Sequence, residues 1–191
     1  MSNGAAGHNY HPEIDGLRAI AVLSVFLHHI NPSLVPGGFI GVDVFFVISG
    51  YLITGQIASQ IRAGTFTIRQ FYQRRINRIV PALTTVILAS IAAGLVLLSP
   101  DDLTQLTRSA ASSIFGFSNV FFWREYGNYF AANVDEAPLL HTWSLSVEEQ
   151  FYIVWPLLLL CLLKWLNRYM ISILFLLLLA ALVVSEVGTR I

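Results

Sequence analysis

The sequence has few charged residues and almost no cysteine. Asp, Glu, Lys and Arg make up only 12% of its 191 residues, about half of the usual share of about 25%. The single cysteine, Cys161, lies in an apolar run, which excludes a disulfide scaffold. The 11 basic residues balance the 11 acidic ones, so no overall charge favours nucleic acid as a partner. Because 55% of the residues are hydrophobic, intrinsic disorder is excluded and an integral membrane protein remains.

Long apolar runs predict an all-α polytopic membrane protein. A transmembrane helix requires about 20 mostly apolar residues. We expect five spans, at residues 17–30, 39–61, 79–98, 151–163 and 170–185, although the first and fourth runs are short. The fourth can span if the Lys164 side chain extends to the membrane surface. A sixth segment, residues 109–123, is apolar but rich in Ser, Gly and Asn, and predicts either a further span or a re-entrant segment. We therefore expect about five to six transmembrane helices that belong to a larger helical bundle.

Basic residues in the short connections predict the orientation. Residues 62–78 contain five arginines and no acid, so this connection is expected to face the cytoplasm, as is the N-terminus. Lys164 and Arg168 favour a second cytoplasmic connection. Both connections lie on one side of the membrane only if residues 109–123 do not cross it completely.

The first candidates for function are the ionisable residues of the first apolar run, because such groups are costly inside a membrane. Arg18 and His29 are eleven positions apart, so on one helix they share nearly the same face at a separation of about 16 Å. An imidazole with its usual pKa of about 6.5 suits acyl transfer, as a base or as a nucleophile. The alternative is that Arg18 is an interfacial anchor and His29 a core histidine. His28 points away and is expected to be structural.

The second apolar run combines glycines, hydroxyl groups and one carboxylate. Three glycines permit close contacts between helices: Gly41, Gly50 and Gly55. Ser49 and Tyr51 supply hydroxyl groups that are candidates for a pocket. The carboxylate of Asp43 requires a partner within a span, and contact with His29 would stabilise the protonated imidazole. The alternative for the glycines is a tightly packed helix pair without a further role.

Two arginines follow at a helical spacing. Arg75 and Arg78 are three positions apart and share a face of a helix. Guanidinium groups bind phosphate in a bidentate manner, so the pair is a candidate phosphate site at the cytoplasmic membrane surface. The alternative is that both arginines serve topology and contact anionic lipid headgroups.

The last candidate segment is residues 141–152. Glu148 and Tyr152 are four positions apart and share a helical face. A carboxylate beside an aromatic ring suits a sugar-binding site, and a carboxylate also orients a catalytic histidine in triads. Trp143 and Tyr152 fit an aromatic belt at the membrane interface. The alternative is the exposed start of an amphipathic helix.

The order of these motifs resembles the acyltransferase 3 family of bacterial membrane O-acyltransferases. The resemblance covers residues 10–160 and rests on segments 10–21, 41–53, 75–78 and 141–152, together with His29. The form of the last segment is similar to members that are often fused to an SGNH-like domain. The resemblance implies about ten membrane helices, so residues 13–191 are expected to be the N-terminal portion of the acyltransferase domain, in the bacterial inner membrane. Residues 1–12 are expected to be a cytoplasmic N-terminal tail, as the distribution of basic residues indicates.

The resemblance also implies transfer of an acyl group, commonly acetyl from acetyl-CoA, to a hydroxyl of a cell-envelope glycan such as lipopolysaccharide O-antigen. The expected partners are membrane lipids, acyl-CoA, the glycan acceptor and the missing C-terminal helices, with no nucleic acid, no metal and no permanently bound cofactor. The expected catalytic residues are His29, Glu148 and Asp43. The expected donor-binding residues are Arg18, Arg75 and Arg78. The expected acceptor or pocket residues are Ser49, Tyr51, Trp143 and Tyr152.

A membrane transporter coupled to protons, or a non-catalytic membrane partner, is the alternative function, because intramembrane His, Asp and Arg suit a proton pathway as well. The sequence lacks the internal repeat and the paired broken spans that many carriers show.

Overall fold

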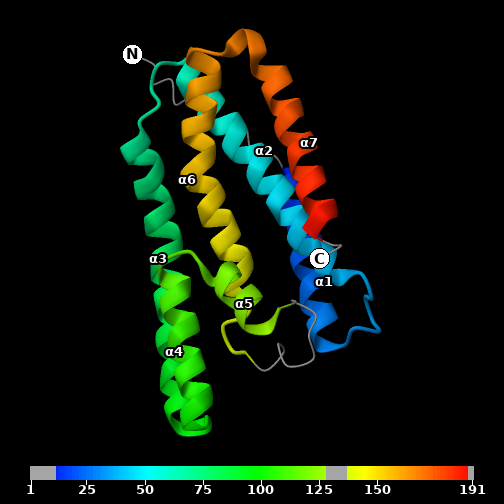
Figure 1. Ribbon diagram of the computed structural model, residues 1–191, viewed down its shortest axis with the longest axis vertical. Helices are drawn as coiled ribbons and strands as arrows, with labels where there is room; N and C mark the ends of the chain where they lie inside the picture. The colour runs from blue at the N-terminus through cyan, green and yellow to red at the C-terminus, as the bar shows by residue number, and fades with distance from the viewer. Residues whose placement is uncertain (1–11, 128–136, 189–191) are drawn as a thin grey trace. The chain divides into compact units, whose positions relative to one another are not determined.

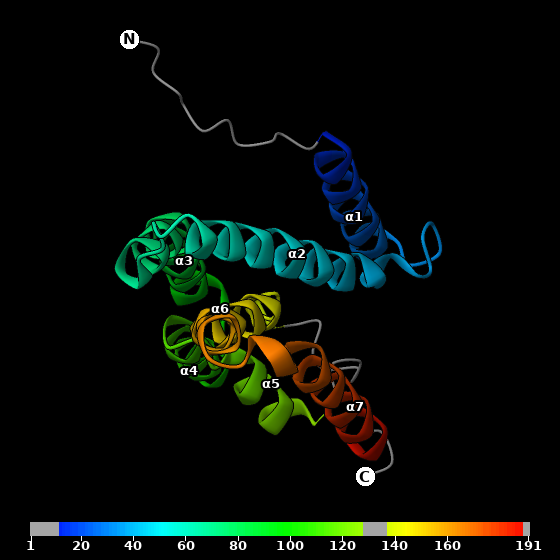
Figure 2. The same ribbon diagram turned by 90° about the horizontal axis from the view of Figure 1, so that it is seen from above.

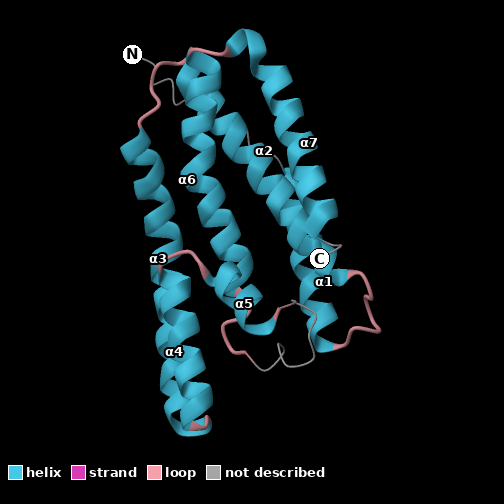
Figure 3. Cartoon of the chain, viewed as in Figure 1, coloured by secondary structure: helices cyan, strands magenta, loops and turns pink. Residues whose placement is uncertain are grey.

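The computed structural model describes residues 12–127 and 137–188, and within these ranges the protein is helical without strands (Figure 3). The expected all-α class is confirmed. The elements are α1 (Pro12–Ile30), η1 (Gly38–Ile40), α2 (Gly41–Arg62), α3 (Ile68–Leu97), α4 (Pro100–Ile114), α5 (Ser118–Tyr126), α6 (Thr142–Lys164), η2 (Asn167–Tyr169) and α7 (Met170–Gly188). Of the expected N-terminal tail, residues 1–11 lie outside the described residues.

Judged by length and composition, four segments of the described chain are able to cross a membrane. They are Gly38–Arg62, Ile68–Leu97, Thr142–Lys164 and Asn167–Val187. The first expected run forms helix α1, which has 19 residues but carries Glu13, Asp15 and Arg18 in its first two turns, and it is not among the four. The expected number of five to six spans is therefore only approximate.

Helix α3 begins eleven residues earlier than the apolar run that predicts it. It starts at Ile68 and includes most of the arginines that were expected in a connection. Arginine is a good helix former, and Thr67 precedes the helix in an extended conformation. The connection between α2 and α3 consequently shrinks to residues 63–67, and the arginines acquire fixed directions on a helix.

The chain divides into two compact units, residues 1–56 and 57–191. In the first unit, α1 and the start of α2 approach closely at two glycines. A Cβ atom at Gly41 would overlap the Ala21 carbonyl oxygen, and one at Gly38 would overlap the Ser24 carbonyl oxygen. The expected role of Gly41 in close helix packing is confirmed. At Gly50 and Gly55, a Cβ would meet no atom of the described chain within 4 Å.

In the second unit, α4 turns back beside the distal half of α3 (Figure 1). Helix α4 begins at a cap in which the Ser99 hydroxyl accepts a hydrogen bond from the Asp102 backbone N–H. Gly94 gives α4 room, because a Cβ there would lie 2.7 Å from the Leu106 Cδ2 atom. The apolar core joins α3, α4, α5 and the segment before α6, through Ile87, Leu106, Ala110, Phe122 and Leu139.

Residues 109–123 form two short helices rather than one continuous span. Helices α4 and α5 meet at a turn in which Gly116 has a φ angle of +70°, a backbone conformation that favours glycine. Buried hydroxyl groups fasten both helices to α6, with Ser113 to Thr142 at 2.8 Å and Ser118 to Ser146 at 2.7 Å. Seen from above, α3, α4 and α5 are arranged around α6 (Figure 2).

Helix α6 starts beside α5 and ends in the half of the second unit in which α3 begins (Figure 1). The basic segment of α3 and the turn with Lys164 and Arg168 therefore lie in one half of this unit. That arrangement is the one that the distribution of arginine and lysine requires.

Candidate functional site

Arg75 lies between two aromatic rings where α3 faces α6. Its Cζ atom is 5.5 Å from the ring centroid of Phe71, one turn earlier on α3, and 5.1 Å from that of Tyr152 on α6. Phe71 is only 1% exposed and Tyr152 only 6% exposed. A guanidinium group over aromatic faces at these distances gains cation–π attraction, which grows when water is excluded. The side chain of Arg75 is thus held between the two helices.

Tyr152 and Glu148 meet on α6, as their spacing predicts. The Tyr152 hydroxyl donates a hydrogen bond to Glu148 Oε1. The Glu148 carboxylate also interacts electrostatically with the Arg75 guanidinium. One residue after Tyr152, the Ile153 carbonyl accepts a hydrogen bond of 3.1 Å from Tyr72 on α3. These contacts set the register between α3 and α6.

A cavity of about 220 Å³ opens beside these residues. Its lining comes from α3 and α6, with polar groups from Arg75, Arg78, Glu148 and Tyr152 and an apolar wall of Ile79, Ala82, Leu83 and Leu145. Two guanidinium groups attract an anionic group and can bind phosphate oxygens. The adjoining wall suits an uncharged chain attached to that anion. Because Arg75 and Arg78 line the same cavity, the prediction that they share a face of the helix is confirmed.

Arg75 contacts α6 near the middle of that helix. Its partner Tyr152 lies twelve residues before Lys164, which corresponds to about 18 Å along α6. The guanidinium therefore lies beside the middle of α6 instead of at its end. The physical reason is that α3 continues as a helix through the arginine-rich segment and directs Arg75 toward the aromatic rings.

His29 and Arg18 both lie on α1, in the first unit. The His29 Nδ1 atom is 2.8 Å from the Val25 carbonyl oxygen. Since a carbonyl only accepts hydrogen bonds, Nδ1 carries the proton, and the neutral ring has its lone pair on Nε2. His29 is exposed, and Arg18 forms an ion pair with Asp15 at 3.7 Å.

His28 has the structural role that was expected. Its Nδ1 atom donates a hydrogen bond of 3.0 Å to the Val35 carbonyl oxygen, and its ring meets the Phe39 ring edge-on at 5.7 Å between centroids. These contacts fasten the connection between α1 and α2 to the end of α1. Partial exposure of the ring is consistent with this role.

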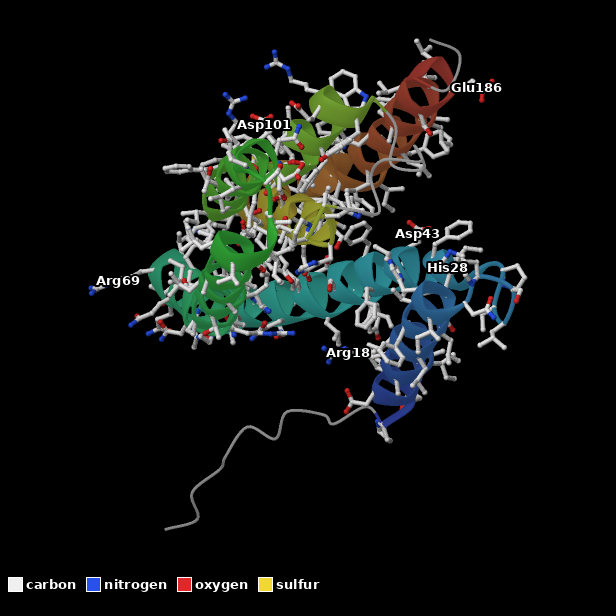
Figure 4. All side chains as sticks on the ribbon, turned by 90° about the horizontal axis from the view of Figure 1, so that it is seen from below. Arg18, His28, Asp43, Arg69, Asp101 and Glu186 are labelled. Atoms are coloured by element: carbon white, nitrogen blue, oxygen red, sulfur yellow. The ribbon has the colours of Figure 1, made fainter. Side chains whose placement is uncertain are left out.

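The remaining candidates of the first unit lie on α2. Asp43 is in the first turn of α2 and exposed (Figure 4), where the helix dipole favours a negative charge. Within the described part of the chain, no hydrogen bond or ion pair joins Asp43 to His29. Ser49 is half-buried, whereas Tyr51 is 66% exposed.

Trp143 and His141 lie near the start of α6. Trp143 is partly buried and packs against the apolar core around Leu106 and Phe122. Partial burial of the His141 ring lowers its pKa below the usual value, although the residue as a whole is exposed.

The structure thus brings four of the predicted residues to one cavity, namely Arg75, Arg78, Glu148 and Tyr152. Sequence reasoning missed two aromatic residues of α3 that complete the site. Phe71 precedes Arg75 by one helical turn, and this spacing is the signal that could have identified it. Tyr72 gives no comparable signal, because its partner lies 81 positions away in the chain.

Comparisons with known proteins agree with the arrangement of motifs. Residues 11–187 match the family described as acyltransferase domain. The chain is 42% identical over 160 residues to "Peptidoglycan O-acetyltransferase OatA" of Listeria monocytogenes, a match that covers 83% of this chain and 26% of the relative. It is 41% identical over 149 residues to "O-acetyltransferase OatA" of Staphylococcus aureus strain NCTC 8325, which covers 78% of this chain and 24% of the relative.

A putative O-acetyltransferase of Staphylococcus aureus strain MSSA476 is 40% identical over 168 residues, or 87% of this chain and 28% of the relative. The chain therefore spans about a quarter of the length of these relatives. No solved structure shows a significant match.

Proposed function

Since this integral membrane protein belongs to the acyltransferase domain family, we propose that it transfers an acetyl group from an acyl-CoA donor to a hydroxyl group of a cell-envelope glycan. The observation that carries the proposal is the cavity between α3 and α6, where two guanidinium groups adjoin an apolar wall. This combination suits a donor that joins phosphate groups to a long uncharged arm.

In this proposal, Arg75 and Arg78 bind phosphate oxygens of the donor. The aromatic rings of Phe71 and Tyr152 hold the Arg75 side chain before the donor arrives, which lowers the entropy lost on binding. At about 220 Å³ the cavity is small, because pockets for complete ligands are typically about 300–1,000 Å³. It accommodates part of the donor, and Glu148 directs Arg75 by its opposite charge.

His29 is the proposed catalytic residue. The hydrogen bond from Nδ1 to Val25 leaves the lone pair of the neutral ring on Nε2, which is the form required of a base or a nucleophile. As a base, Nε2 removes the proton of the acceptor hydroxyl while the hydroxyl oxygen attacks the thioester carbonyl carbon. The carbon–sulfur bond then breaks, and the proton passes to the thiolate that leaves.

Peptidoglycan is the acceptor we propose in place of lipopolysaccharide O-antigen. Support comes from the 42% identical relative of Listeria monocytogenes, whose name specifies peptidoglycan. The protein is proposed to lie in the bacterial inner membrane with its N-terminus in the cytoplasm. The basic half of the second unit then faces the cytoplasmic pool of acyl-CoA.

The test measures transfer of radiolabelled acetyl groups from acetyl-CoA to peptidoglycan by membranes containing the complete gene product. His29→Ala is expected to lower transfer at least about a hundredfold, because base catalysis contributes factors of about 10²–10⁴. His28→Gln is the matched control and should retain transfer when the rate is normalised to inserted protein. Equal activity of His29→Ala and the unmodified protein would remove His29 from the reaction.

A further inference from the structure

A second cavity lies in the second unit, and its lining shares no residue with the cavity at Arg75 and Arg78. It has a volume of about 340 Å³, within the usual range of about 300–1,000 Å³ for ligand pockets. Its walls come from α4, α5 and adjoining residues, and the described lining contains no lysine, arginine or histidine. The site therefore does not suit a phosphate group, in contrast to the cavity between α3 and α6.

Polar groups in this cavity are held in fixed directions. The Gln105 amide oxygen accepts a hydrogen bond of 3.0 Å from the Tyr126 hydroxyl. The amide nitrogen of Gln105 donates at 3.3 Å to Glu125. Asp102, one turn earlier on α4, also lines the cavity, and one of its oxygens accepts a hydrogen bond of 2.6 Å from the Ser99 hydroxyl. The cavity thus presents an oriented amide and a carboxylate side by side on one helix.

Aromatic rings form another wall. Phe121, Phe122 and Tyr126 all line the cavity. Phe122 and Tyr126 are nearly parallel at 24° with 6.1 Å between centroids, and Phe121 meets Phe122 edge-on at 5.3 Å. Pyranose rings have apolar faces that pack on aromatic rings and hydroxyl edges that hydrogen-bond to amides and carboxylates. An uncharged sugar ring matches both kinds of wall.

The cavity also lies at the appropriate end of the unit. Leu98 and Asp102, where α3 passes into α4, belong to its lining. The end of α3 at Leu97 is 22 residues beyond Arg75, or about 33 Å along the helix. If Arg75 and Arg78 face the cytoplasm, this end of the unit faces the outer side of the membrane, where a cell-envelope glycan is located.

We propose that this second cavity binds an uncharged pyranose ring of the acceptor glycan. The assignment to the acceptor rests on the proposed function, whereas the binding of a sugar rests on the cavity itself. Gln105 provides hydrogen bonds to the sugar hydroxyls, and Tyr126 positions Gln105. The two cavities thereby separate donor from acceptor along α3.

The test is calorimetric titration of N,N′-diacetylchitobiose into the protein in lipid nanodiscs. Saturable binding is expected, and Gln105→Ala should weaken it about tenfold, because one or two hydrogen bonds are lost. Gln70→Ala makes the same change at an exposed position in the first turns of α3 and should bind like the unmodified protein. Absence of saturable binding, or equal affinities of Gln105→Ala and Gln70→Ala, would overturn the proposal.

Tyr126→Phe is a second variant, chosen because it is expected to fold normally. It retains the ring that packs on Phe122 and removes only the hydroxyl. It should weaken sugar binding about threefold; unchanged affinity would show that Tyr126 does not position Gln105. Acetyl-CoA binding by the same samples should be unaffected by either change. Sugar binding without any acetyl transfer would refute the proposed function but support the sugar site. Acetyl transfer without sugar binding would support the proposed function and refute the sugar site.

Discussion

The side chain of Arg75 owes its position to two aromatic rings. Phe71 contributes from the same helix and Tyr152 from the neighbouring one, at 5.5 and 5.1 Å from the guanidinium carbon. A guanidinium is planar and weakly hydrated, so it tolerates this setting better than an ammonium group. The rings therefore prepare the cation for a phosphate ligand.

Two substitutions at Tyr152 distinguish the contribution of its ring to donor binding from that of its hydroxyl. Tyr152→Leu removes the ring beneath Arg75 and should weaken acetyl-CoA binding about fivefold, because a cation–π contact contributes about 0.5–1 kcal/mol or more. Tyr152→Phe retains the ring and removes only the donor to Glu148, so its affinity should fall by about twofold or less. Equal losses in both variants, measured by calorimetry, would show that the ring does not position Arg75.

Local spacing predicted the contacts that lie within one helix. Glu148 with Tyr152, and Arg75 with Arg78, follow from helical geometry alone, and the structure confirms that each pair shares a face. The contact between Arg75 and Tyr152 could not be predicted, because it depends on the register of α3 against α6. That register is determined by packing and by such distant hydrogen bonds as that from Tyr72 to Ile153.

Helices α1 and α2 depend on glycine where they meet. At Gly38 and Gly41 any side chain would overlap backbone carbonyl oxygens of α1, and backbone cannot move aside as a flexible side chain can. Close approach of this kind is a common means of helix association in membranes. The sequence indicated Gly41 but did not distinguish it from Gly50 and Gly55, since all three occur in one apolar run.

Alanine substitutions at Gly41 and Gly50 should have opposite effects on the free energy of unfolding, because the two glycines have different surroundings. Gly41→Ala should lower the free energy of unfolding by about 1–3 kcal/mol, as overpacking does. Gly50→Ala adds a methyl group where, beyond the helix's own backbone, no atom of the described chain lies within 4 Å, and should stabilise α2 by up to about 1 kcal/mol through helix propensity. Denaturation in detergent, followed by circular dichroism, measures both values. Equal stability of the two variants would contradict the observed contact between α1 and α2.

The turn between α4 and α5 is fastened to α6 by buried hydroxyl groups. Ser146 is 1% exposed, and its Oγ atom contacts both the backbone N–H and the hydroxyl of Ser118 at 3.1 and 2.7 Å. These contacts explain why an apolar segment rich in serine forms no continuous span. Its composition signalled ambiguity, whereas the break at Gly116 depends on partners that lie about thirty positions later.

Removal of the Ser146 hydroxyl tests this attachment. Ser146→Ala leaves the buried groups of Ser118 without this partner and should lower the free energy of unfolding by about 1–3 kcal/mol. Ser144→Ala is the matched control, because its hydroxyl donates only to the His141 carbonyl within the same turn; its effect should stay within about 0.5 kcal/mol. Thermal unfolding of both variants in one detergent gives the comparison, and equal midpoints would contradict the role of Ser146.

At the scale of the whole molecule, the sequence predicted the helical class and most of the long apolar helices. Apolar length is a strong signal because a bilayer demands it. The first run was less clear, since charges occupy the early turns of α1. Helix α7 shows the remaining difficulty: it is apolar except for Ser172, Ser185 and Glu186, and none of its most apolar window is buried within the described chain. Its composition therefore identifies a span without indicating which face packs.

The central proposal is that the cavity between α3 and α6 binds the phosphates of the acyl donor. The most direct measurement is titration of acetyl-CoA into the protein in nanodiscs, with Arg75→Ala compared against Arg69→Ala. Both changes remove one positive charge from α3, but Arg69 is exposed and points outward (Figure 4). We predict that Arg75→Ala weakens binding at least about tenfold and that Arg69→Ala changes it by less than about twofold. Equal affinities for the two variants would contradict the donor site.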